Sequence, residues 1–79
     1  MRATASRQYA QINDVVTVDM ENRIVFINGE AVPNPVFDGS PVTTVLNHVD
    51  QSKEVGIYAV PTPKYLKGIS FQVRRRPHC

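Results

Sequence analysis

The sequence lacks several features on which small proteins often depend for stability. It has 79 residues, no tryptophan and a single cysteine, Cys79. One cysteine cannot form a disulfide within the chain, so the fold has to rely on a hydrophobic core, on oligomerisation, or on both. The length suits one domain and excludes the large catalytic scaffolds, since a (β/α)₈ barrel needs about 250 residues.

Long hydrophobic runs are also missing. The longest unbroken apolar runs contain four residues, at 24–27 and 57–60. A membrane span needs about 20 consecutive apolar residues, and a secretory signal needs a run of about 7–15. The sequence therefore predicts no membrane segment, and we expect a cytoplasmic location.

Acidic side chains are absent from the last third of the sequence. Residues 1–54 contain four Lys and Arg against seven Asp and Glu, a charge of −3, whereas residues 55–79 carry +5 with no acid. The five cationic residues are Lys64, Lys67, Arg74, Arg75 and Arg76. Such a dipolar chain can bind an acidic partner through its basic region, or it can pair with itself, basic region to acidic region.

Short apolar segments rich in β-branched residues predict a mostly β structure. We expect a polar N-terminal tail at 1–13, a single domain at 14–76 and a C-terminal tail at 77–79. Within the domain, strands are expected at 15–20, 23–27, 30–32, 55–60 and 69–75. Residues 23–27 are apolar on both alternating faces, which favours a central position in the sheet.

The dipeptide Asn28-Gly29 is the strongest local signal. A two-residue type I′ turn needs positive φ at both positions, and Asn and Gly adopt it at the least cost. Residues 30–32 should therefore fold back on 23–27. Pro33 and Pro35 then end regular pairing, because neither donates a backbone hydrogen bond, so this third strand is expected to be very short or at an edge.

Ser40 and Pro41 predict the start of a helix, because serine accepts from the first free amides and proline suits the first helical position. The apolar residues that follow recur at i, i+3, i+4 and i+7: Val42, Val45, Leu46 and Val49. This spacing predicts one apolar face on a helix over about 41–51. The β-branched valines and threonines of the segment lower its helix propensity.

Residues 69–75 alternate cleanly between apolar and polar side chains. Ile69, Phe71 and Val73 should point inward, and Ser70, Gln72 and Arg74 outward. The resulting order β-β-β-α-β-β predicts an α+β fold, a small antiparallel sheet of about five strands with one short helix packed on one face. The alternative is a small five-stranded β-barrel in which 41–51 is only a helical crossover.

Candidate partner-binding residues lie in the basic last third. They are Lys64, Tyr65, Leu66, Lys67, Gln72, Arg74, Arg75 and Arg76. If the last two strands form a hairpin, the two lysines should lie within a few residues of the arginines unless the long loop splays them apart. Arginine suits phosphate, and Tyr65 could stack on a base, although an aromatic content of 8% is low for a stacking platform. The arginines could equally form a solvated strand end or contact an acidic protein.

Tyr65 and Leu66 lie in a loop stiffened by Pro61 and Pro63, and flanking lysines give this apolar pair a charged rim. The pair could form a contact tip, or it could fold back and cap an open end of the core.

No catalytic, cofactor or metal site is predicted. The four glycines are scattered singly rather than grouped in a phosphate-binding loop. A structural zinc site usually needs four ligands, and His78 with Cys79 and a distant His48 do not supply them. On a helix, His48 and Asp50 would not face each other.

The leading hypothesis is a non-enzymatic binding or assembly module that acts through self-association, as a dimer in the first instance, and through one macromolecular partner. The alternative is a nucleic-acid-binding protein that uses the basic C-terminal strand and loop. A third hypothesis, a small enzyme with a site between subunits, requires an accessible His48.

Overall fold

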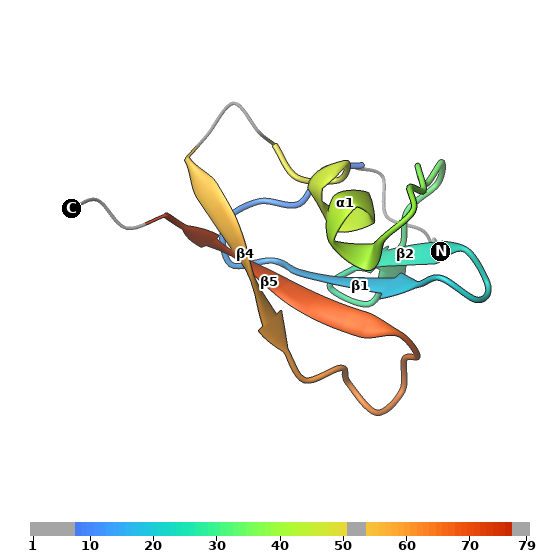
Figure 1. The fold of residues 1–79 in the computed structure, drawn as a ribbon. Coiled ribbons are helices and arrows are strands. Elements are labelled where there is room, and N and C mark those ends of the chain that lie inside the picture. Colours follow the sequence, from blue (N-terminus) through green and yellow to red (C-terminus); the bar gives the residue numbers. More distant parts are fainter. Residues whose placement is uncertain (1–7, 51–53, 77–79) are drawn as a thin grey trace.

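A computed structural model describes residues 8–50 and 54–76 as an antiparallel sheet with one short helix on one face (Figure 1). The strands are β1 (Val15–Asp19), β2 (Ile24–Ile27), β3 (Glu30–Ala31), β4 (Val55–Val60) and β5 (Ile69–Arg75), and the helix is α1 (Pro41–Leu46). Their order in the sheet is β3-β2-β1-β5-β4. The α+β prediction is confirmed. The barrel alternative is wrong, because β3 and β4 are the two ends of an open sheet.

The centre of the sheet is β1, which pairs with β2 on one side and with β5 on the other. β2 is an interior strand, as expected, but its outer neighbour β3 is only two residues long. Ile24 and Phe26 are consequently half-buried, whereas Val25 and Ile27 face the core and are fully buried.

The turn between β2 and β3 has the predicted geometry. Asn28 has φ of 53° and Gly29 has φ of 85°, so both residues occupy the left-handed region that a type I′ turn requires. The Asn28 side chain links the turn to the start of β1. Its Oδ1 accepts from the Val15 amide at 3.0 Å, and its Nδ2 donates to Asp14 at 2.9 Å. The prediction of a very short third strand at an edge is also confirmed.

Helix α1 starts where predicted but ends earlier than the expected 41–51. The Ser40 hydroxyl accepts from the Thr43 amide at 3.2 Å, and Pro41 is the first helical residue. The helix ends at Leu46, because a segment rich in valine and threonine has a low helix propensity.

The buried side of α1 also differs from the predicted apolar face. Thr44 and Val45 are fully buried, whereas Val42 is 46% exposed. A buried threonine is tolerated here because its hydroxyl donates to the Ser40 carbonyl at 2.9 Å and accepts from the Asp38 amide at 3.1 Å. Val49 is buried as predicted, but it lies beyond the end of the helix.

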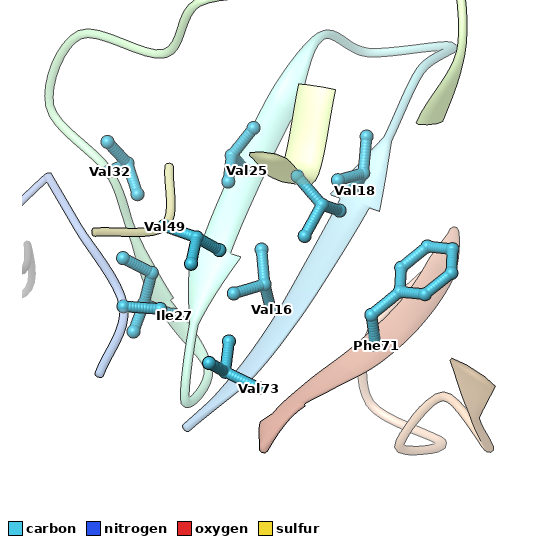
Figure 2. Packing of buried hydrophobic residues seen from close by; sticks show 10 residues of the cluster. Val16, Val18, Val25, Ile27, Val32, Val49, Phe71 and Val73 are labelled. Carbon is cyan, nitrogen blue, oxygen red and sulfur yellow. The ribbon is translucent and has the colours of Figure 1, made fainter. Parts of the chain in front are cut away.

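The hydrophobic core lies between α1 and one face of the sheet. Figure 2 shows its side chains converging from β1, β2 and β5. The cluster consists of Ala10, Val16, Val18, Val25, Ile27, Val32, Val45, Val49, Phe71 and Val73. Ala10 belongs to the segment expected to be a polar tail, yet its amide donates to the His48 carbonyl at 2.7 Å and it forms a bridge with Val49. Residues 1–7 and 77–79 of the expected tails lie outside the described residues.

Among the residues that the structure describes, no helix has the length and hydrophobicity needed to cross a membrane.

Candidate functional site

The face of the sheet opposite α1 carries a second, different set of side chains. Strand alternation and register place on it Val15, Thr17, Asp19, Ile24, Phe26, Ala31, Tyr58, Val60, Ser70, Gln72 and Arg74. We call this set the open face, because α1 packs only on the other side of the sheet (Figure 1).

The loop 61–68 covers part of the open face. The hydroxyls of Thr17 and Ser70 are 2.8 Å apart, and Ser70 donates to the Thr62 hydroxyl at 3.0 Å. The Thr62 hydroxyl in turn donates to the Gly68 carbonyl at 3.0 Å. Thr17 and Ser70 are therefore each only 1% exposed. Ser70 points outward from the core as predicted, but the loop closes over it and buries it.

The other β5 side chains do not separate into buried and exposed positions as regularly as the alternation predicts. Phe71 and Val73 are buried in the core as expected, and Gln72 and Arg74 lie on the open face. Ile69 lies on the predicted inward face, because it pairs with Val18, but it is 47% exposed rather than buried. It is the first residue of β5, at the end of the strand next to the loop.

Gly68 allows the loop to approach β1 closely. Its φ is 116°, and a Cβ at this position would overlap the carbonyl oxygen of Val18. Only glycine combines this backbone conformation with this close approach. The sequence shows an isolated glycine here and no sign of the contact that requires it.

A cleft of about 460 Å³ lies on the open face between the loop 61–68 and the Asn28–Gly29 turn. We call it the Tyr65 cleft. It is lined by Val15, Thr17, Asn28, Gly29, Val60, Pro61, Pro63, Tyr65, Leu66 and Gln72. Tyr65 is 74% exposed and reaches towards the turn, since a Cβ on Gly29 would lie only 3.0 Å from the Tyr65 hydroxyl. Of the pair Tyr65 and Leu66, only Leu66 is half-buried, so the two residues do not cap the core together.

The arginines on and beyond the open face contact neutral groups. The Arg74 guanidinium lies 5.3 Å from the centre of the Tyr58 ring, and its Nε donates to the Gln72 amide oxygen at 2.8 Å. Arg76 donates to the Val55 carbonyl at 3.1 Å. Tyr58, Arg74 and Gln72 thus form a row that starts at the Tyr65 cleft.

The hairpin β4–β5 does not bring the lysines close to Arg75 and Arg76. Register pairs Val60 with Ser70 at the loop end and Val55 with Arg75 at the other end. Five residues of extended strand separate Ser70 from Arg75, about 17 Å at the usual rise. Lys64 and Lys67 lie in the loop at the opposite end of the hairpin (Figure 1), so of the two arrangements that the sequence left open, the loop holds them apart from these arginines.

The Asp19 carboxylate is held chiefly by Asn22, and Lys67 adds only a small electrostatic effect. The Asp19 carboxylate accepts from the Asn22 side-chain amide at 2.9 Å and from the Asn22 backbone at 3.1 Å. Chiefly these bonds, with a smaller effect from the Lys67 charge, hold the pKa of Asp19 below its usual value. The Asp19 carboxylate therefore stabilises the β1–β2 turn.

His48 is a structural residue. It is 2% exposed, and its Nε2 accepts from the Val36 amide at 3.0 Å. Nδ1 lies 3.2 Å from the Gln8 carbonyl, so in the tautomer that satisfies both bonds Nδ1 donates to that oxygen. This burial removes the hypothesis of an accessible His48 at a site between subunits.

No group of three or more His, Cys, Asp or Glu side chains in the described part of the chain could hold a metal ion. His78 and Cys79 lie outside the described residues.

A second hollow, of about 600 Å³, is lined by Tyr9, Gln11, Leu46, Asn47, Val49 and Asp50. Residues 51–53 follow Asp50 directly and are not described, so this hollow is not a defined site.

Comparison with known proteins finds no family model, no curated protein and no solved structure that matches this chain. The geometry of the open face and of the sheet edges is therefore the basis for any functional proposal.

Proposed function

We propose that this chain is a non-enzymatic binding and assembly module that self-associates through the outer edge of β4. β4 is the last strand of the sheet, and in the described residues it pairs only with β5. An unpaired edge presents backbone N–H and C=O groups that can pair with another strand.

The register identifies which backbone groups of β4 point outward. The Arg76 amide donates to the Glu54 carbonyl at 3.0 Å, so Glu54 and Arg76 form a hydrogen-bonded pair. Such pairs alternate in an antiparallel ladder, which directs the backbone groups of Gly56, Tyr58 and Val60 towards β5. The same alternation directs the backbone groups of Val55, Ile57 and Ala59 away from β5.

The composition of β4 is the observation that carries the proposal. Its six residues, Val-Gly-Ile-Tyr-Ala-Val, include no charged residue and no proline. Exposed edges are usually blocked by charges, by proline or by very short strands. The other edge of the sheet is blocked in this way, because β3 has two residues, one of them Glu30, and Pro33 follows closely. Only the β4 edge is long and unprotected.

A second copy of the chain fits this edge in an antiparallel, two-fold arrangement. Pro61 has no amide hydrogen, and the Val55 carbonyl already accepts from Arg76. These limits favour the register that places Ile57 of one copy opposite Ala59 of the other. That register forms about four intermolecular backbone hydrogen bonds and brings the two Tyr58 side chains together on the open face. The added contact suits a small domain, which buries only about 60% of its unfolded surface.

Proline at position 59 tests the proposal. Ala59→Pro removes an outward amide hydrogen but none of the hydrogen bonds between β4 and β5, and edge strands tolerate proline. Ala59→Thr is the matched control because it keeps the amide. Sedimentation equilibrium at high micromolar concentration should show dimers for the wild type and for Ala59→Thr, and monomers for Ala59→Pro with an unchanged circular dichroism spectrum.

A monomeric wild type at that concentration would contradict self-association. A dimeric Ala59→Pro variant would instead show that the chain self-associates through a surface other than the β4 edge.

A further inference from the structure

We infer that the open face binds single-stranded nucleic acid, with a base in the Tyr65 cleft and the phosphate backbone along Arg74 and Lys64. The inference uses the cleft and cations of the open face rather than the backbone edge of β4, and it does not depend on self-association. Tyr58, a β4 residue, borders both surfaces. The inference gives a specific geometry to the nucleic-acid alternative that the basic residues and Tyr65 suggest in the sequence.

The Tyr65 cleft has the chemistry that a nucleobase requires. Its lining combines apolar side chains with Thr17, Asn28 and Gln72 and contains no charged residue. A base has flat apolar surfaces and polar edges, so such a neutral cleft can hold it without the cost of burying a charge. The largely exposed Tyr65 ring at its wall offers a stacking surface.

Gln72 is placed to contact the edge of a base. It lines the cleft, and Arg74 donates to its amide oxygen at 2.8 Å. The NH₂ group is then the part of this amide that can donate to a base. Asn28, by contrast, uses both of its amide atoms to hold Val15 and Asp14.

Positive charge lies on both sides of the cleft. Lys64 is exposed and adjacent to Tyr65, and Arg74 is exposed, lies against the Tyr58 ring and uses neutral partners. Two nearby carboxylates are held by neutral amides and keep their negative charge: Asp19 accepts from Asn22, and Asp14 accepts from Asn28 and Gln11. About 13 Å of β5 separates Ser70, at the loop end, from Arg74, so an extended strand of a few nucleotides can reach from the cleft to the guanidinium.

The aromatic side chains favour single-stranded nucleic acid over an acidic peptide or a duplex. The sequence has only three tyrosines and three phenylalanines, but the fold places exposed Tyr58 and Tyr65 on the same side of the sheet. The acidic groups of a peptide would contact the cations, but only a nucleotide strand places a flat base beside every negative charge. In a duplex the bases are stacked and paired, so none is free to enter the cleft.

Fluorescence anisotropy can measure the binding of labelled oligo(dT) and oligo(U) of about 12 nucleotides, within the site sizes of about 4–16 nucleotides seen for small single-strand-binding domains. We expect Tyr65→Leu to weaken binding roughly 5- to 150-fold, the effect of losing one stacked base. Tyr65→Phe keeps the ring and should bind like the wild type.

Salt dependence isolates the contribution of Arg74. Arg74→Gln should reduce the slope of log K against log salt by about 0.7, the value for one phosphate contact with a single strand. Arg23→Gln is the matched control, because it removes the same charge from a side chain that lies 4.8 Å from the Phe37 ring, and Phe37 packs against the core on the other side of the sheet. Its slope should equal that of the wild type.

Three results would overturn the inference: no binding to either oligonucleotide at low salt, equal losses for Arg23→Gln and Arg74→Gln with no effect of Tyr65→Leu, or equally tight binding of polyglutamate or a duplex. The outcome is separable from the test of self-association. A dimer that does not bind oligonucleotide refutes only this site, and a monomer that binds it refutes only the assembly proposal.

Discussion

The two faces of the sheet are stabilised in different ways. On the helix side, ten apolar side chains from the strands, α1 and the N-terminal segment form a single cluster. On the open face, the loop 61–68 is attached through a chain of hydroxyl groups, from Thr17 through Ser70 to Thr62. Beside this attachment lie the exposed Tyr58 and Tyr65 and the Tyr65 cleft.

This difference suggests that the helix side mainly determines stability and the open face mainly provides contacts for partners. Apolar burial contributes about 25 cal/mol per Å² and dominates on the helix side. A hydrogen bond contributes only about 0.5–1.5 kcal/mol net, so the loop on the open face is held more weakly than the core. Substitutions on the open face should therefore change binding at a small cost in stability, whereas substitutions on the helix side should change stability directly.

A pair of isoleucines gives the largest expected contrast. Ile27 is 1% exposed in the core, and Ile27→Ala should lower the free energy of unfolding by about 2–5 kcal/mol. Ile24 is half-buried on the open face, and Ile24→Ala should cost about 1 kcal/mol or less. Urea denaturation of the two variants measures both values. Equal losses would show that the two regions contribute alike to stability and would break the comparison.

A pair of glycines tests the close approach of the loop 61–68 to β1. Gly68→Ala introduces a Cβ that overlaps the Val18 carbonyl at a φ of 116°, and it should cost about 1–3 kcal/mol. A Cβ on Gly39 meets nothing within 4 Å, so Gly39→Ala should be neutral or stabilising by up to about 1 kcal/mol. Thermal unfolding of both variants checks the ranking. A Gly68→Ala variant as stable as the wild type would show that the loop does not need to approach β1 closely.

Acid should reveal the smallest effect, at Asp19. Its folded-state pKa is held below 3.8, chiefly by the Asn22 side-chain amide, so the stabilisation is present above the unfolded-state pKa and is lost as the pH falls through the folded-state pKa. Asn22→Ala should therefore be less stable than the wild type at neutral pH, with the difference disappearing in strong acid. Unfolding curves from neutral pH down to the acid limit measure this difference. In an Asp19→Asn background, the effect of Asn22→Ala should no longer depend on pH.

Features encoded over a few neighbouring residues were predictable from the sequence. The Asn28–Gly29 turn, the Ser40 cap and the alternation of Phe71 and Val73 each depend on local backbone preference or strand periodicity. Features that depend on a distant segment were not predictable. Ser70 is buried because the loop covers it, and Thr44 rather than Val42 is buried because tertiary packing sets the orientation of a six-residue helix.

The candidate site was partly predictable for the same reason. Tyr65, Leu66 and Gln72 were singled out from the sequence, and the structure places them around one cleft. Tyr58 was missed, although strand alternation assigns it to the side of the sheet that carries Gln72 once the hairpin register is known. That register depends on the length and path of an eight-residue loop, which residue preferences alone do not determine.

The core has a further consequence for a chain of this size. Seven of its ten side chains are valine, and it contains neither leucine nor methionine. Valine has a single side-chain torsion that is already restricted in the unfolded chain, whereas burying leucine or methionine freezes several torsions. A valine core therefore loses little rotamer entropy on folding. This small entropy cost offsets the small apolar area that a protein of this size can bury.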